Sequence, residues 1–256
     1  HHGVRVVVGD GVAGFEQLDD ESLVVSTQSG ARHAADLVIL ALGVRPDTTL
    51  AHAAGVEIGE LGGFRVDDQM RTSDPDIFAV GDAVEVRDFV TDEWSLMALA
   101  GPANRQGRIA ADVIAGRDSR FRGTQGTAVV GLFGSTIAWT GVSETTLERV
   151  GDSDYEKIYL YPNSHAGYYP GAKPIAMKVL FRSSDGRLLG AQAAGEDGVD
   201  KRISHIALAI QMGATVYDLE EAELCYSPPF GSAKDPINFA GMVAVVTKLG
   251  GWYTVD

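Results

Sequence analysis

The chain has 256 residues, 45% of them hydrophobic and 22% charged, a composition typical of a soluble globular protein with about two domains. Its formal net charge of −14 argues against a nucleic-acid partner. Its longest apolar runs have about eight residues, too few to cross a bilayer, so no membrane partner is expected. Cys225 is the only cysteine, which excludes an internal disulfide and fits a cytoplasmic protein.

The first distinctive stretch is VRVVVGDGVAGFE, residues 4–16, whose glycines have the GxGxxG spacing of a dinucleotide-binding turn. A working turn of this kind opens a helix. Only about eight residues separate Gly14 from the next β-branched run, which is too few for a crossover helix. We therefore predict that Gly9, Gly11 and Gly14 form a turn without a nucleotide. The predicted structure is a short antiparallel meander of strands at 4–8, 14–17, 22–27 and 36–41.

The next part of the chain alternates short helices and strands. VRPDTTLAHAAG predicts a short helix that Gly55 ends. A polar turn at 72–76 leads into an apolar strand at 77–80, which stops at a Gly-Asp pair. LAGPANRQGRIAADVIAG predicts a helix with a proline near its first turn and Gly116 beyond its end. The apolar side of this helix is expected to carry Ala103, Ile109, Ala110, Val113 and Ile114.

From about residue 123 the pattern changes to strands followed by helices. TAVVGLFG and TIAWTGV predict paired strands, and a helix capped by Ser143 and ended by Gly151 follows them. PIAMKVLFRSSDGRLLGAQAAG predicts a hairpin that turns at Asp185-Gly186, with Met177, Val179 and Phe181 on one face. VDKRISHIALAIQMG and DPINFAGMVAVVTKLG predict the closing helices. This order indicates an α+β unit.

The stretch TSDPDIFAVGDAVEV, residues 72–86, carries the clearest chemistry. A strand that ends in Gly-Asp presents a carboxylate at its carboxyl end, where open α/β sheets bind ligands. Gly81 would let a ligand approach the backbone, and Asp82 can accept hydrogen bonds from sugar hydroxyls. The alternative is that Asp82 only caps a turn.

Several longer motifs resemble one enzyme family. TSDPDIFAVGDA resembles the second flavin-binding motif of the FAD-dependent pyridine nucleotide–disulfide oxidoreductases, and DLVILALGVRPDTTLA resembles their passage from the NAD domain to the FAD domain. AGPANRQGRIAADVIAGR and YSPPFGSAKDPINFAGMVA are similar to the coenzyme A–disulfide reductase and NADH oxidase branch. The resemblance covers residues 3–246 in order.

The resemblance implies an α/β plus α+β fold that corresponds to the C-terminal half of a family member. Residues 1–46 would be the C-terminal tail of the NAD(P)-binding domain, and 47–122 the second half of the FAD-binding domain, both Rossmann-like. Residues 123–256 would form the dimerisation domain, an antiparallel sheet with helices. The first FAD motif, the NAD motif and the redox cysteine would all precede His1.

The resemblance also implies cofactor-binding residues. Gly81 and Asp82 would lie beside the ribityl chain and pyrophosphate of FAD. Pro102, Ala103 and Asn104 would form the first turn of a helix aimed at the flavin ring. A helix N-terminus carries a partial positive charge, which would stabilise negative charge on the reduced ring. The alternative is an ordinary amphipathic helix packed on the sheet.

Tyrosines would complete the catalytic site of the partner subunit in a homodimer. By the resemblance, Tyr226 and either Tyr168 or Tyr169 would flank the redox cysteine, and ordinary packing is the alternative for such residues. Cys225 lies where the family has a small residue, so we expect a structural thiol and not the nucleophile. No metal site is expected, because no paired ligand spacing occurs among His1, His2, His33, His52, His165 and His205.

The implied activity is that of an NAD(P)H oxidoreductase. NAD(P)H would reduce FAD, which would pass electrons to a cysteine held as a mixed disulfide with coenzyme A. NADH oxidase or peroxidase activity, with oxygen or peroxide as acceptor, and persulfide reduction are the alternatives, and the choice between NADH and NADPH stays open. For this chain in isolation we expect a non-catalytic dimerisation and partial flavin-binding module.

Overall fold

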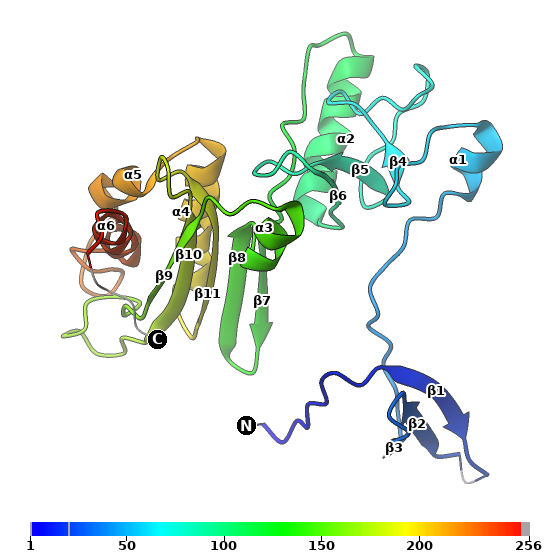
Figure 1. Ribbon diagram of the computed structural model, residues 1–256, viewed down its shortest axis with the longest axis horizontal. Coiled ribbons are helices and arrows are strands. Elements are labelled where there is room, and N and C mark those ends of the chain that lie inside the picture. Colours follow the sequence, from blue (N-terminus) through cyan, green and yellow to red (C-terminus); the bar gives the residue numbers. More distant parts are fainter. Residues whose placement is uncertain (1, 20, 252–256) are drawn as a thin grey trace. The chain divides into compact units, whose positions relative to one another are not determined.

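The computed structural model describes residues 2–19 and 21–251, so His1, named above among the histidines, lies outside the described residues. Contacts within the chain divide it into two units, His1–Val44 and Arg45–Asp256, which are described one at a time (Figure 1). Within the described part of the chain, no helix combines the length and apolar character that spanning a bilayer requires.

The first unit is a three-stranded antiparallel sheet in the order β1-β2-β3. Two predicted strands, 14–17 and 22–27, are confirmed, and no helix follows the glycines. The Asp10 carboxylate accepts hydrogen bonds from the backbone N–H and hydroxyl of Ser29 at 2.9 and 2.6 Å, and these bonds lower the pKa of Asp10. These bonds tie the glycine turn to the turn between the second and third strands. The strands are β1 (Val12–Gln17), β2 (Leu23–Thr27) and β3 (Arg32–Ala35).

The predicted strands at 4–8 and 36–41 are wrong. Neither run has regular structure, and the third strand of the meander is β3 instead. Their apolar side chains are exposed, with 75% of Val6 and 81% of Ile39 accessible to solvent. A β-branched run becomes a strand only when a neighbouring backbone takes up its hydrogen bonds, and the described residues provide no such neighbour.

The second unit begins with α1 (Thr49–Ala54), which ends as predicted at Gly55, whose φ of +68° is left-handed. A small sheet follows, in which β5 (Val84–Arg87) lies parallel to β4 (Phe64–Arg65) and antiparallel to β6 (Trp94–Leu96). The predicted strand at 77–80 is wrong, because only an isolated bridge joins Phe78 to Arg71. Like the runs in the first unit, it lacks a strand to pair with.

The predicted helix after this sheet is confirmed as α2 (Ala100–Ile114), and Gly116 beyond it has a φ of +82°. Three of the five expected apolar positions, Ile109, Ala110 and Val113, are buried, whereas Ala103 is half-buried. The prediction for Ile114 is wrong, since 68% of it is exposed. The buried face of α2 joins a small core with Val84 and Val86 of β5 and with other apolar residues of 66–121.

The rest of the chain contains a five-stranded antiparallel sheet in the order β7-β8-β11-β10-β9. The hairpin at Asp185-Gly186 is confirmed as β10 and β11, and the paired strands before it as β7 and β8. The helix α3 (Glu144–Val150) is also confirmed, because the Ser143 hydroxyl accepts a bond from the Thr146 N–H. The strands are β7 (Ala128–Leu132), β8 (Ser135–Gly141), β9 (Glu156–Leu160), β10 (Ile175–Phe181) and β11 (Leu188–Gly195).

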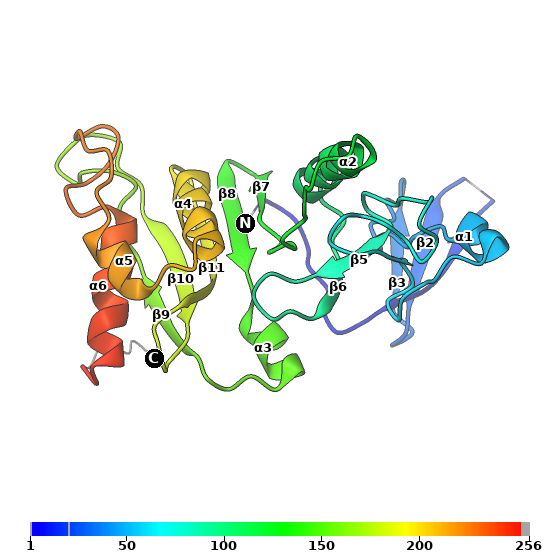
Figure 2. The same cartoon turned by 90° about the horizontal axis from the view of Figure 1, so that it is seen from above.

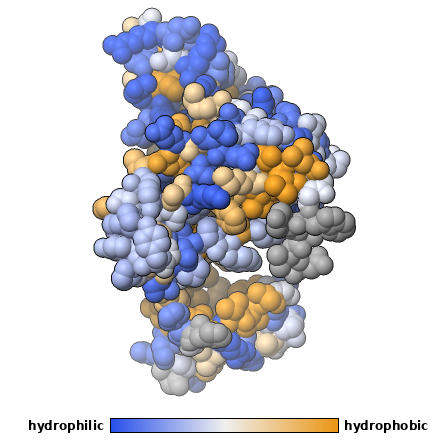
Figure 3. Space-filling view, turned by 90° about the vertical axis from the view of Figure 1, so that its left-hand side faces the viewer, coloured by the Kyte–Doolittle hydropathy of each residue, from blue (hydrophilic) through white to orange (hydrophobic). Residues whose placement is uncertain are grey.

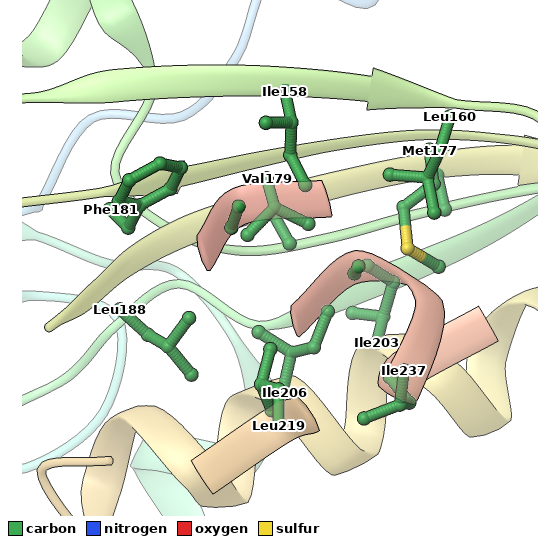
Figure 4. Close-up of a cluster of buried hydrophobic side chains, with 14 of the residues drawn as sticks. Ile158, Leu160, Met177, Val179, Phe181, Leu188, Ile203, Ile206, Leu219 and Ile237 are labelled. Atoms are coloured by element: carbon green, nitrogen blue, oxygen red, sulfur yellow. The ribbon is translucent and has the colours of Figure 1, made fainter. Parts of the chain in front are cut away.

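Helices cover one face of this sheet. α4 (Val199–Gln211) packs on β8 and β11, while α6 (Pro236–Lys248) lies against β9 and pairs with the short α5 (Val216–Glu221), as Figure 2 shows. The predicted alternation is confirmed, because Met177, Val179 and Phe181 all point into the core (Figure 4). They meet side chains of α4, α5 and α6 there, among them Ile203, Ile206, Leu219 and Ile237.

The side of the molecule that carries α5 and α6 is mainly hydrophilic, with separate hydrophobic patches among the polar residues (Figure 3). On α6 itself, Phe239 and Val246 are 41% and 36% exposed. The helix thus presents apolar side chains both to the core and to the outside.

Candidate functional site

The Gly-Asp corner and the start of α2 are held together by a buried glutamine. Gly81 has a left-handed φ of +93°, and its N–H donates to the Oε1 atom of Gln106 at 2.8 Å. Gln106 is only 1% exposed and lies one helical turn after Pro102. The two segments that the sequence singled out for one ligand are therefore neighbours in space.

The first turn of α2 is free to receive an anion. Leu99 precedes the helix without a side-chain cap, and no acidic residue lies in the first turn. Pro102 is buried, Ala103 half-buried and Asn104 exposed. Because the first N–H groups of a helix have no partner within it, this end offers donors and a partial positive charge.

The other half of the corner offers an acceptor. Asp82 is exposed, and within the described residues its carboxylate makes no hydrogen bond or ion pair. A Cβ atom added at Gly81 would meet no other atom within 4 Å, so the backbone can be approached closely there. An acceptor, a bare stretch of backbone and an uncapped helix start together suit a ligand that carries hydroxyl groups and negative charge.

The predicted tyrosines form a second group. The hydroxyl groups of Tyr168 and Tyr226 lie 2.8 Å apart, and the two residues are 76% and 49% exposed. Tyr169 instead sets its ring edge-on to His165, with 5.9 Å between ring centroids. The structure thus joins Tyr168, and not Tyr169, to Tyr226. The hydrogen bond with Tyr226 raises the pKa of the Tyr168 phenol.

Sequence reasoning missed three buried polar residues, Gln106, Arg202 and Asp235. Gln106 follows Pro102 by four residues and precedes Ala110 by four, which places it on the apolar side of the predicted helix. A polar residue on that side could have indicated a buried hydrogen bond. Arg202 gave the same signal, because it precedes Ile206 by four residues in the first closing helix. Asp235, the capping residue of α6, is its buried partner at 2.7 Å.

The remaining candidates are Cys225 and the histidines. Cys225 is free and exposed, which does not fit a packing role in the core. Among the described residues, no three His, Cys, Asp or Glu side chains gather into a group that could hold a metal ion.

Comparison with known proteins gives this geometry its context. The family model "Pyridine nucleotide-disulphide oxidoreductase" matches residues 1–107, and the model of that family's dimerisation domain matches residues 127–235. A coenzyme A disulfide reductase of Staphylococcus aureus (strain bovine RF122 / ET3-1) is 33% identical over 221 residues, which make up 86% of this chain and 50% of that protein. The chain thus spans about half the length of the curated relatives it matches.

Two solved structures match closely. Reduced CoADR-RHD of Bacillus anthracis superimposes with a TM-score of 0.91 at 46% identity, covering 96% of this chain and 44% of that chain. An NAD-dependent persulfide reductase from A. fulgidus gives a TM-score of 0.95 at 34% identity, covering 100% and 47%. These matches confirm the expected mixture of α/β and α+β elements, and the chain belongs to the pyridine nucleotide-disulphide oxidoreductase family.

Proposed function

We propose that this chain is the C-terminal portion of an FAD-dependent NAD(P)H oxidoreductase that reduces coenzyme A disulfide or a related persulfide or disulfide. The 2.8 Å bond from Gly81 to Gln106 carries the proposal, because it sets an exposed carboxylate beside the uncapped start of α2. The similarity to a coenzyme A disulfide reductase and to a persulfide reductase supports the substrate class.

The corner would hold FAD through complementary polar groups. When bound, FAD supplies two-electron chemistry between NAD(P)H and a disulfide. Asp82 accepts hydrogen bonds from hydroxyl groups of the cofactor, and Gly81 allows the close approach of its chain. The backbone N–H groups in the first turn of α2 would stabilise negative charge on the cofactor. A side-chain cap would occupy these donors, and an acidic residue would repel the charge, but α2 has neither there.

The tyrosine pair would donate a proton in the active site of the partner subunit. Reduction of one coenzyme A disulfide consumes NAD(P)H and a proton and yields two thiols, so each thiolate formed needs a proton. Tyr168 and Tyr226 share a hydrogen bond, and their exposure leaves both phenols accessible to a sulfur atom. They would hold the proton at a phenol oxygen and donate it to the departing thiolate. The redox cysteine would lie outside this chain.

The same proposal covers domain organisation. Residues 1–46 would close the NAD(P)-binding domain, 47–122 would complete the FAD-binding domain, and 123–256 would form the dimerisation domain of a cytoplasmic homodimer. The exposed apolar runs at 4–8 and 36–41 support this division, because strands of a complete domain would cover them. The apolar side chains that α6 presents outward support subunit association.

Flavin content tests the corner. In the full-length protein, Asp82→Asn and Gln106→Leu should each weaken FAD binding about 10- to 100-fold, the effect of losing a hydrogen bond to a charged or buried group. Asp76→Asn is the matched control, since it removes an exposed carboxylate from the turn at 72–76. Absorbance near 450 nm per protein would report the result. Equal flavin content in all three variants would refute the assignment of the corner.

The electron acceptor is tested by turnover. Oxidation of NADH and of NADPH by the full-length protein should be much faster with coenzyme A disulfide than with oxygen alone. Equal rates with and without the disulfide would favour an oxidase. The 27.1 kDa chain by itself should be inactive, since we propose that the redox cysteine, the first FAD motif and the NAD motif are supplied by the remainder of the protein.

A further inference from the structure

The two loops that carry the paired tyrosines are fastened to one buried ion pair. We define the Tyr168 loop as residues 161–174, between β9 and β10, and the Tyr226 loop as residues 222–235, between α5 and α6. Arg202 of α4 and Asp235, at the end of the Tyr226 loop, are each 1% exposed. The guanidinium donates to both carboxylate oxygens, at 2.7 and 3.3 Å.

The same guanidinium holds the Tyr168 loop. Its Nη2 atom donates to the backbone oxygen of Ser164 at 2.7 Å, and its Nη1 atom donates to that of Gly198 at 3.2 Å. Ser164 lies four residues before Tyr168. One planar side chain therefore bridges the start of one loop and the end of the other.

Further hydrogen bonds attach the Tyr226 loop to neighbouring segments. The N–H of Ala166 donates to the oxygen of Gly231 at 2.9 Å, which ties the two loops directly. The Nζ atom of Lys201, next to Arg202, donates to the oxygen of Phe230 at 3.2 Å. At the other end, the Asn238 side chain donates to the oxygen of Ala222 at 2.7 Å. The loop is thus held at both ends and at residues 230 and 231.

The start of α4 is shaped around the guanidinium. Gly198 has a left-handed φ of +68°, and a Cβ atom placed there would lie 2.3 Å from the Nη1 atom of Arg202. Gly213, just beyond the other end of α4, has a similar φ of +71° with no atom within 4 Å of its added Cβ. Only the first of these two glycines makes room for the arginine.

We propose that Arg202, paired with Asp235, is a positioning residue that holds the Tyr168 hydroxyl against the Tyr226 hydroxyl. The use of this tyrosine pair in turnover rests on the proposed function, but the positioning itself does not. The two hydroxyls lie 2.8 Å apart although Tyr168 is 76% and Tyr226 49% exposed, so burial alone does not fix the two rings. The loop anchors supply the order that packing lacks.

A purely stabilising role explains the ion pair less well. Removing two charges from water is costly, and apolar side chains of similar volume commonly stabilise a core at least as well. Apolar replacements could not, however, donate to the Ser164 oxygen or accept from the first turn of α6, as Asp235 does from the Ile237 N–H at 3.1 Å. Directional bonds to two loops are what this pair adds.

The experiment compares two glycine variants of the full-length protein, Gly198→Ala and the matched control Gly213→Ala. Both place alanine at a left-handed φ beside α4, so both carry similar backbone strain. Only Gly198→Ala displaces Arg202. A third variant, Arg202→Met/Asp235→Leu, removes both charges and replaces them with apolar side chains of similar volume.

Ultraviolet titration of the phenols provides the readout. Subtracting the titration curve of the Tyr168→Phe form of each protein isolates the ionisation of Tyr168. In Gly198→Ala and in the double variant, the pKa of Tyr168 should fall towards the ordinary tyrosine value of about 10, since the bond that raises it is lost. Gly213→Ala should leave it unchanged. The kcat with coenzyme A disulfide should fall about 10- to 100-fold in the same two variants, with the KM for NAD(P)H unchanged.

An unchanged Tyr168 titration in Gly198→Ala, or an equal shift in Gly213→Ala, would overturn the proposal, even if the double variant does not fold. Failure of the proposed function is a different result. The unaltered protein would then show no turnover of the disulfide, while its tyrosine titration would still depend on Gly198 and not on Gly213.

Discussion

The run VRVVV at 4–8 has a stronger β-strand composition than the run MKVLF at 177–181, yet only the second forms a strand. The second run is part of β10, lies between β9 and β11, and leaves Val179 and Phe181 fully buried. The first is irregular, with Val6 and Val8 75% and 84% exposed. Composition selects the residues that can enter a sheet, whereas the presence of a neighbouring strand decides whether they do.

The largest difference between the two runs should appear on truncation of a buried ring. Phe181→Ala in this chain should lower the free energy of unfolding by about 3–5 kcal/mol, because it leaves a cavity in the core. The matched change Val6→Ala should alter it by less than about 0.5 kcal/mol, because 75% of Val6 is exposed already. Urea unfolding of both variants measures this. A comparable loss in Val6→Ala would mean that the first run is also packed.

A charge placed in the other exposed run distinguishes the chain from the full-length protein. Ile39→Lys should change the unfolding free energy of this chain by less than about 0.5 kcal/mol, since Ile39 is 81% exposed. In the full-length protein the same change should cost about 3 kcal/mol, because we propose that residues 36–41 there become a covered strand and the ammonium would be buried. The comparison of thermal unfolding in the two proteins checks this. An equal, negligible effect in both would contradict the proposed domain organisation.

The smallest expected effect concerns two carboxylates, one in each unit. The hydrogen bond from Lys157, at 2.7 Å, and that from Lys178 lower the pKa of Glu144 below its ordinary value of 4.5. A lowered pKa in the folded state contributes stability above pH 4.5 that is lost as the pH falls through the folded value. Glu144→Gln should therefore cost about 0.5–1 kcal/mol at pH 7 and progressively less as the pH falls below 4.5.

Asp10 is the counterpart in the first unit, where hydrogen bonds from Ser29 lower its pKa as well. The partner of Asp10 is the neutral Ser29, whereas Glu144 pairs with two lysines, so Asp10→Asn should have a smaller effect at pH 7 than Glu144→Gln. Urea unfolding between pH 3 and pH 7 compares the two. A larger loss in Asp10→Asn would show that the glycine turn depends on its carboxylate more than α3 depends on its ion pairs.

Much of the second unit could be predicted because its signals are local. Ser143 caps α3 through a bond three residues away, Gly55 and Gly151 end helices by adopting left-handed φ, and Asp185-Gly186 closes a hairpin. Each depends on neighbours in sequence. Strand β9 and helix α5 escaped prediction because they are short and are stabilised mainly by α6 and the sheet.

The candidate site was predictable only in part. Gly81, Asp82 and the start of α2 carry recognisable chemistry, and so do Tyr168, Tyr169 and Tyr226. Sequence reasoning left the choice between Tyr168 and Tyr169 open, because adjacent residues share one loop and the loop path determines which ring meets Tyr226.

The sequence by itself determined which elements form wherever caps, turns and alternating side chains act over a few residues. Only the tertiary structure decided which apolar runs become strands, which tyrosine is paired, and that Gln106 joins the Gly-Asp corner to α2 while Arg202 joins two loops. The physical reason is that strand pairing and buried hydrogen bonds join residues far apart in the chain. Their partners, such as Ser164 38 residues from Arg202, leave no local trace in the sequence.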